Sequence, residues 1–393
     1  MIYLDNAATT KPAPEVVDAM LSCLTEEYGN PSAIYSLASS AKKKVNNCKR
    51  TIASAIGANM DEIYFTAGGT ESDNWAIVAT AEAYGNKGRH IITSKIEHHA
   101  VLHTCEYLEK RGYEITYLDV DKDGIVDLEQ LEKAIRPDTI LISIMFANNE
   151  IGTIQPIREI GSIAKAHDVL FHTDAVQAFG QISIQVDDMG IDMMSASGHK
   201  CNGPKGIGFL YIRSGLKIGS LIHGGAQERG RRAGTENVPG IVGFEAATKR
   251  ALRMLDEKAG REVQLRDYLI RRLEGEIPLC HLNGHRTKRL PGNVNVAFRF
   301  VEGESILIML DMKGICASSG SACTSGSVDP SHVLSAIGLS EEEAHGSLRM
   351  TLSEENTKEE MDIVVEQLKE IVGKLRAMSP LYEEYEKRIR SNE

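Results

Sequence analysis

Seven short apolar runs alternate with helical patterns between about residues 60 and 212, and this alternation constrains the fold more than any other feature. Several runs are rich in Ile and Val and show little apolar–polar alternation, as in strands buried on both faces. Strands that alternate with helices indicate a mainly parallel sheet with helices on both sides. The predicted strands are 62–66, 90–93, 114–118, 140–146, 169–173, 193–196 and 208–212. The helical patterns between them are 71–84, 98–110, 127–135 and 157–166.

A different pattern begins after the last of these strands. A long helical pattern covers 241–274, and new strand patterns follow near 292–298 and 314–317. A last helical pattern lies near 357–376. Elements that no longer alternate regularly indicate a second unit of the α+β class.

The chain has 393 residues, which is enough for two domains with cores of their own. We predict an α/β fold with a large domain at 15–255 that carries the mainly parallel seven-stranded sheet. A smaller α+β domain is predicted at 256–393. Residues 1–14 are expected to form an N-terminal segment that packs with the small domain.

Composition excludes several classes of protein. The formal net charge of −11 argues against a general nucleic-acid binder, which needs a basic surface. The first residues lack the charged and apolar regions of a signal peptide, and no apolar stretch is long enough to span a bilayer. The seven cysteines are scattered without a C-x-x-C pair, which suits a reducing compartment. We therefore expect a soluble cytoplasmic protein without a membrane partner.

Polar residues follow five of the predicted strands at the point where each strand ends. These segments are 68–70, 97–99, 148–150, 172–177 and 197–200. In an open α/β sheet, ligands bind in the crevice beyond the carboxyl ends of the strands. The five segments therefore predict one shared site.

Lys200 is the most informative residue of these segments, because a buried strand delivers it into a glycine-rich loop. A partly desolvated lysine can lose its proton and form a Schiff base with a carbonyl. A surface lysine in a tight turn is the alternative interpretation. Lys205 is a rival for the same role, but it lies further from the strand end, so Lys200 is favoured.

Two further segments narrow the chemistry. Gly69 and Thr70 precede a helix, where free N–H groups and the helix dipole favour a phosphate, although a plain capping turn has the same pattern. Asp174 ends a strand and either bonds backbone in the core or keeps a pyridinium nitrogen protonated. A lysine, a partnered aspartate and a phosphate cradle together are typical of pyridoxal phosphate sites. His99 is either a stacking and acid–base group or a histidine at a helix start.

Ordered motifs extend along nearly the whole chain. They lie at 3–10, 28–32, 65–72, 97–101, 147–152, 174–177, 195–200, 224–228, 232–237 and 318–325. Together they resemble the NifS/IscS-type cysteine desulfurases of the class V aminotransferase superfamily. The resemblance implies the pyridoxal phosphate-dependent transferase fold, type I, and a homodimer.

The resemblance also implies a role for each matching residue. Lys200 would carry pyridoxal 5'-phosphate as a Schiff base, and Asp174 would pair with the ring nitrogen. Gln177 would bond the ring hydroxyl, and His99 would stack on the ring and move protons. The other implied cofactor contacts are Gly69, Thr70, Asn149, Ser197, Gly198, His199 and, from the neighbouring subunit, Thr235. The implied substrate contacts are Asn30, Asn149 and Arg349.

Cys323 lies in the Ser- and Gly-rich segment 318–325, which predicts a mobile, exposed thiol. Its thiolate is the nucleophile that would receive sulfur. No intrinsic metal site is expected, although Cys323 is a candidate for a transient iron–sulfur ligand. Cys201, next to the lysine, stays open as a second reactive thiol. The remaining cysteines are expected to be small buried hydrophobes: Cys23, Cys48, Cys105, Cys280 and Cys316.

The sequence thus predicts removal of sulfur from L-cysteine, leaving L-alanine and a persulfide on Cys323. An acceptor or scaffold protein would collect the sulfur for iron–sulfur clusters or thiolation. A selenocysteine lyase stays an alternative, because selenium and sulfur have nearly the same shape. Another class V aminotransferase has no use for a mobile cysteine, and intact site residues disfavour a non-catalytic scaffold. The charged tail at 381–388 is either a docking surface or a solvated helix.

Overall fold

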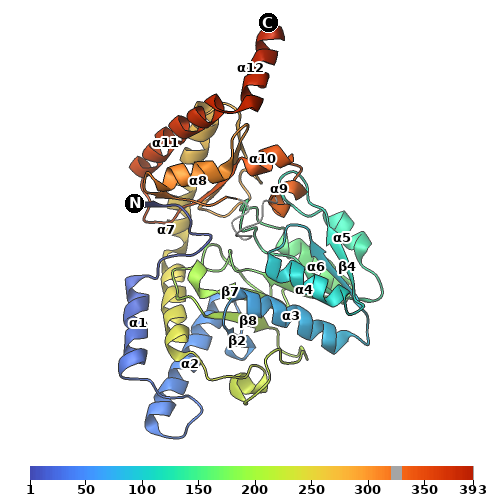
Figure 1. Cartoon of the computed structure of the whole chain (residues 1–393). Helices are drawn as coiled ribbons and strands as arrows, with labels where there is room; N and C mark the ends of the chain where they lie inside the picture. The colour runs from blue at the N-terminus through green and yellow to red at the C-terminus, as the bar shows by residue number, and fades with distance from the viewer. Residues whose placement is uncertain (320–329, 393) are drawn as a thin grey trace.

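The computed structural model describes residues 1–319 and 330–392, and a seven-stranded sheet lies at the centre of its larger part (Figure 1). Its strands, in spatial order, are β2 (Ile63–Thr66), β8 (Gly208–Ile212), β7 (Met193–Ser197), β6 (Leu170–Asp174), β5 (Thr139–Ser143), β3 (His90–Ser94) and β4 (Glu114–Leu118). Strand β8 is antiparallel to β2 and β7, and the other four pairs are parallel. The predicted α/β fold with a mainly parallel seven-stranded sheet is confirmed.

Successive residues of the central strands enter different hydrophobic clusters, because side chains alternate between the two faces of a sheet. Met193 and Met194 of β7 belong to opposite clusters. On β8, Leu210 points to one cluster, whereas Phe209 and Tyr211 belong to the other. Both faces are therefore buried, which explains why these strands lack apolar–polar alternation in the sequence.

Helices cover both faces of the sheet. Those on the side of Leu210 are α3 (Gly69–Tyr84) and α4 (His99–Glu109). Those that contribute to the other cluster are α1 (Pro14–Thr25), α2 (Ser36–Ala55), α5 (Leu128–Ala134), α6 (Ile157–Ala166) and the first part of α7 (Val238–Glu276). The sequence patterns predicted α3 to α7 but not α1 and α2.

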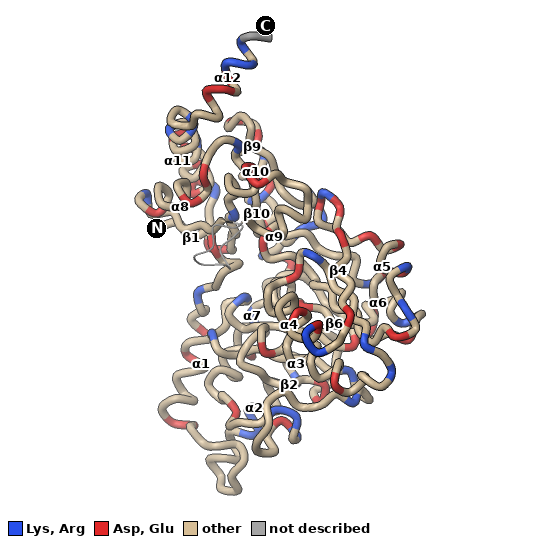
Figure 2. The backbone as a smooth tube through the Cα atoms, turned by 45° about the vertical axis from the view of Figure 1, so that its right-hand side comes forward, with Lys and Arg blue, Asp and Glu red and all other residues tan. Residues whose placement is uncertain are grey.

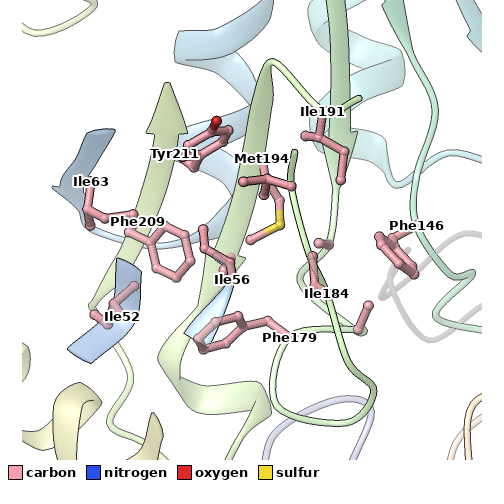
Figure 3. Packing of buried hydrophobic residues seen from close by; sticks show 14 of the residues in the cluster. Ile52, Ile56, Ile63, Phe146, Phe179, Ile184, Ile191, Met194, Phe209 and Tyr211 are labelled. Carbon is pink, nitrogen blue, oxygen red and sulfur yellow. The ribbon is translucent and has the colours of Figure 1, made fainter. Parts of the chain in front are cut away.

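Aromatic side chains join the sheet to the helices on this second side. Phe209 packs edge-to-face on Phe179 with ring centroids 5.2 Å apart, and Phe179 meets Phe244 of α7 in the same way at 5.7 Å. Figure 3 shows Ile52 and Ile56 beside Phe209 in this cluster. Such packing buries large apolar surfaces and holds the strand ends in a fixed position.

The C-terminal part has a cluster of its own around a three-stranded antiparallel sheet. The elements of this C-terminal part are β9 (Cys280–Leu282), β10 (Asn293–Phe298), α8 (Gly303–Asp311), α9 (His332–Ala336), α10 (Glu341–His345), β12 (Ser347–Thr351), α11 (Lys358–Ala377) and α12 (Pro380–Asn392). The N-terminal strand β1 (Ile2–Tyr3) pairs in parallel with β11 (Ile315–Cys316), and Leu4 is fully buried in the same cluster.

Helix α7 connects the two parts without a break. Ile241 and Phe244 near its start belong to the cluster under the large sheet, and Leu269 and Leu273 near its end belong to the C-terminal cluster. A boundary at 255/256 therefore falls inside one continuous helix.

Strands β9 and β12 have no counterpart among the sequence predictions. Strand β12 contains only two apolar residues, Leu348 and Met350, and both enter the C-terminal cluster. Figure 2 shows α12 projecting away from the rest of the chain with acidic and basic segments along it. Across the described residues, no helix combines the length and the apolar composition that a membrane span requires.

Candidate active site

A cavity of about 350 Å³ lies at the carboxyl ends of the central strands. It collects residues from the ends of β6 and β7, from the start of α3, from the N-terminal segment and from β12. The predicted site residues that line it are Gly69, Thr70, Asn149, Asp174, Gln177, Ser197, His199, Lys200 and Arg349. Residues of β6, β7 and α3 meet here because parallel strands end at the same edge of the sheet, whereas β12 of the C-terminal sheet contributes Arg349.

Lys200 enters this cavity from a single turn of 3-10 helix, η2 (Gly198–Lys200), directly after β7. Its Nζ donates hydrogen bonds to the carbonyl oxygens of Ala7 and Ala8, the latter at 2.9 Å. The Ala7 oxygen also accepts from Nε2 of Gln177 at 3.0 Å. The Thr10 N–H and hydroxyl both donate to the carbonyl oxygen of His199, at 2.9 and 2.8 Å. These hydrogen bonds hold the N-terminal segment against Lys200 and fix the direction of its side chain.

Two buried carboxyl groups share the cavity. Asp174 accepts the Val176 N–H at 2.9 Å, and burial raises its pKa, while this hydrogen bond and the Lys200 charge oppose the rise. Asp73 also lines the cavity, and burial followed by the charge of Asp174 raises its pKa well above the ordinary range. Its Oδ1 has no hydrogen-bond partner among the described residues. A ligand with a positive N–H group would relieve this pair of carboxyls.

The start of α3 forms an anion cradle on another wall. Its N-cap residue, Gly68, has no side chain to cap the first turn, so backbone N–H groups remain for a ligand. A Cβ on Gly69 would lie 2.5 Å from Cγ2 of Val176, so only glycine fits there. Glu71 would repel an anion, but Arg232 binds both of its oxygens at 2.8 and 3.0 Å.

Arg349 projects from β12 and is 2% exposed. Its Nη2 pairs with Asp5 at 3.0 Å, and its Nη1 donates to the carbonyl oxygen of Asn149 at 3.1 Å. Its Nε is buried without a hydrogen-bond partner among the described residues. A buried guanidinium that keeps an unsatisfied donor suits a carboxylate ligand.

A model of the family described as aminotransferase class V matches residues 2–364. The chain belongs to this family. It is 59% identical to cysteine desulfurase IscS of Methanosarcina thermophila over 97% of this chain and 94% of that protein. It is 53% identical to cysteine desulfurase IscS of Clostridium botulinum over 98% of both. A solved structure of a NifS-like protein matches with a TM-score of 0.90 and 39% identity, covering 95% of this chain and 99% of that one. The resemblance inferred from the motifs is confirmed.

In this member of the family, His98 lines the cavity and His99 does not. His98 is the N-cap of α4 with an extended backbone, and its Nδ1 accepts the Ala100 N–H at 3.1 Å. His99 is the first residue of the helix, and its ring stacks on His103, one turn later, at 4.8 Å. The structure therefore places His98, one position before the predicted His99, on the cavity wall. The i,i+4 spacing of His99 and His103 was the sequence signal for this difference, because it places these two side chains together on one face of α4.

The electrostatics of His98 agree with a ring-stacking group. Burial, followed by the charge of Lys200, lowers its pKa to about 4, so the imidazole is neutral near pH 7. Because Nδ1 accepts a hydrogen bond, the neutral ring carries its proton on Nε2.

Other predicted residues of this family member lie outside the cavity. Thr235 and Asn30 are exposed on the surface, and neither lines the cavity of its own chain. Gly198 is buried beneath the loop, where its N–H donates to the carbonyl oxygen of Ile207 at 3.0 Å, so that N–H is not available to a phosphate. Cys323 lies outside the described residues.

The other cysteines separate by burial. Cys23, Cys48, Cys105 and Cys201 are buried, whereas Cys280 and Cys316 are only half-buried, contrary to the sequence prediction. Burial raises the pKa of the Cys201 thiol to about 12, and its Sγ donates to the carbonyl oxygen of Gly198 at 3.3 Å. Cys201 is therefore a packed thiol rather than a second nucleophile.

Proposed function

We propose that this chain is a pyridoxal 5'-phosphate-dependent cysteine desulfurase that converts L-cysteine to L-alanine and passes the sulfur on. The convergence of Lys200, Asp174 and the start of α3 on one cavity carries the proposal. That arrangement occurs in a chain that matches proteins named cysteine desulfurase over nearly its whole length.

The residues present fit pyridoxal phosphate. Lys200 is the attachment point, and the buried Asp174 is the partner of a protonated ring nitrogen. His98 is the neutral ring that stacks on the cofactor, and Gln177 bonds its hydroxyl. The phosphate and remaining contacts are assigned to Gly69, Thr70, Asn149, Ser197 and His199. When bound, the cofactor supplies a ring that withdraws electrons from the substrate's α-carbon.

The residues of the chain then divide the work. Arg349 binds the substrate carboxylate through its unsatisfied donor and holds the α-carbon in place, with Asn149 beside it. Lys200 would accept the substrate's α-proton. His98 lines the cavity as a neutral ring whose Nε2–H can donate a hydrogen bond to the ligand.

Sulfur transfer is assigned to Cys323 from its match to the family's motif. The Cys323 thiolate attacks the substrate sulfur, and a new S–S bond forms as the C–S bond breaks. The electrons of the broken bond stay on carbon, which takes a proton and becomes the methyl group of alanine. The persulfide is then delivered to an acceptor or iron–sulfur scaffold protein, in which step Cys323 is also the candidate for a transient cluster ligand.

His98 and His99 form a matched pair for testing the assignment of the histidine. His98→Ala is expected to lower the turnover of cysteine by about 100-fold, because a hydrogen-bond donor and a stacking ring are lost together. It should also shift the absorbance of the bound cofactor. His99→Ala, which removes the adjacent ring outside the cavity, should change neither by more than about threefold. Alanine formation and cofactor spectra measure both; equal effects would contradict the assignment.

A homodimer is part of the proposal. Val17, Leu21 and Leu24 form an exposed apolar stripe at i, i+4 and i+7 on α1, each more than half exposed. Tyr28 and Ile34, in the segment between α1 and α2, are also exposed, at 72% and 102%. A second copy that covers this surface would explain why two residues that match the family's site, Thr235 and Asn30, lie outside the cavity of their own chain.

Reaction products decide the proposed function. Purified protein loaded with pyridoxal phosphate is given L-cysteine and a reductant, and alanine and sulfide are measured together. Equal amounts of both are expected, because each turnover splits one C–S bond. Sulfide without alanine, or transamination products instead, would contradict the proposal. A parallel reaction with L-selenocysteine compares kcat/KM for the two substrates, and a strong preference for selenocysteine would favour the selenocysteine lyase.

The proposal also includes a cytoplasmic location.

A further inference from the structure

A second, smaller cavity of about 40 Å³ is also lined by Lys200. It shares Lys200, Gln177 and Ala7 with the large cavity, so the two spaces meet at the lysine. Its polar lining consists of Asn6, Gln177, Gln181, Lys200, Glu262, Asn293 and Thr351. A space of this size lined by several polar groups suits a bound water rather than an empty void.

Glu262 of α7 is the only carboxyl among the described residues that line this second cavity. It is 2% exposed, and its Oε1 has no hydrogen-bond partner among the described residues. A Cβ on Gly292 would lie 3.3 Å from Oε2 of Glu262 and 2.7 Å from the carbonyl oxygen of Leu352. Glycine at 292 therefore keeps the space beside the carboxyl open.

The charged groups near Glu262 lie on α7 itself, in the segment after β12 and in η2. Lys258, one turn earlier on α7, is 3.9 Å from Oε1, and Glu354 of the segment after β12 is 3.6 Å from Lys258. Arg250 in turn pairs with Glu354 at 2.7 Å. Lys200 lines the same cavity as the carboxyl. Burial raises the pKa of Glu262 to about 7, Glu354 adds to the rise and Lys258 opposes it.

We propose that Glu262 accepts a proton from Lys200 through water in the second cavity. This inference rests on the proposed role of Lys200 as the attachment point of the cofactor. An ammonium nitrogen has no lone pair, so Lys200 must lose a proton before it attacks a carbonyl. The second cavity offers that proton a route away from the ligand.

The transfer conserves charge within the buried pair. An N–H bond of the Lys200 ammonium breaks as the water gains that proton, and the water passes one of its own protons to the Glu262 carboxylate. A cation and an anion become a neutral amine and a neutral acid, so no net charge is left in the interior. Because the acceptor is the carboxylate form, the device works above the pKa of Glu262, near 7, and is lost as the pH falls below it.

Combination of the cofactor-free full chain with pyridoxal phosphate tests this route. Stopped-flow absorbance follows the appearance of the lysine-bound cofactor between about pH 6 and 9. The wild-type rate is expected to rise through an ionisation near pH 7. Glu262→Gln, which keeps the shape but accepts no proton, should lose that ionisation and react about tenfold more slowly at the upper end of the range. A wild-type pH profile in this variant overturns the proposal.

Two further variants keep the result interpretable. Glu354→Gln removes a carboxylate of the same cluster that does not line the cavity, so the ionisation should persist and move to lower pH. Glu262→Asp serves if the glutamine variant folds poorly: it should keep the ionisation with a slower rate, and loss of the ionisation would count against the proposal. If no lysine-bound cofactor forms in the wild type, the proposed function fails instead, which separates the two failures.

Discussion

Replacing Lys200 with alanine is expected to abolish the absorbance of lysine-bound cofactor and to lower cysteine turnover by at least about 10³-fold. The loss is large because one side chain both attaches the cofactor and accepts the α-proton. In the structure, Lys200 also bonds the carbonyl oxygens of Ala7 and Ala8. Absorbance spectra of the purified variant with added pyridoxal phosphate, together with alanine formation, measure both effects.

Lys205→Ala is the matched control for this experiment. Lys205 is the only other lysine in the same glycine-rich segment, and it is exposed and does not line the large cavity. Its variant should keep the lysine-bound spectrum and most of the turnover. If Lys205→Ala loses that spectrum and Lys200→Ala keeps it, the attachment point has been assigned to the wrong lysine.

Replacing Cys323 with serine is expected to lower sulfide release under reductant by at least about 100-fold while leaving cofactor binding intact. A serine hydroxyl stays protonated near neutral pH and does not accept sulfur as a thiolate does. Spectra should still change when cysteine is added, because no other site residue has been altered. Sulfide assays and cofactor spectra on the same sample separate the two steps.

Cys316→Ser is the control closest in sequence. Cys316 lies on β11 and is half-buried, so it tests whether any nearby thiol can take the sulfur. Its variant should release sulfide at close to the wild-type rate. Full sulfide release by Cys323→Ser would remove the persulfide step from the proposed mechanism.

The sequence was sufficient for the seven strands of the large sheet and for several of the residues at their ends. Strand-end positions such as Asp174 and Lys200 can be predicted because buried parallel strands are continuous apolar runs, and because their carboxyl ends meet at one edge. The ordered motifs then indicated the family and the cofactor. These inferences depend on local pattern, which a single chain displays directly.

Other features of the site depend on contacts that local pattern does not contain. His98 was missed because a shift of one residue at a helix start changes the direction of the side chain. Strand β12 was missed because its five residues have little apolar character, although it carries Arg349. Asp73 lies in the interior of α3, where nothing in the sequence separates it from an ordinary helix residue.

By itself, the sequence determined the fold class and the family and predicted Lys200 at a strand end, because these follow from periodicity and from ordered motifs. Only the tertiary structure decided which histidine lines the large cavity, that the Ala7 and Ala8 carbonyl oxygens accept hydrogen bonds from Lys200, and that Glu262 lines the adjoining cavity. The physical reason is that these relations join residues far apart in the chain, such as Ala7 with Lys200 and Lys200 with Glu262. The packing of the two hydrophobic clusters along α7 brings such residue pairs together, and no spacing in the sequence encodes that proximity.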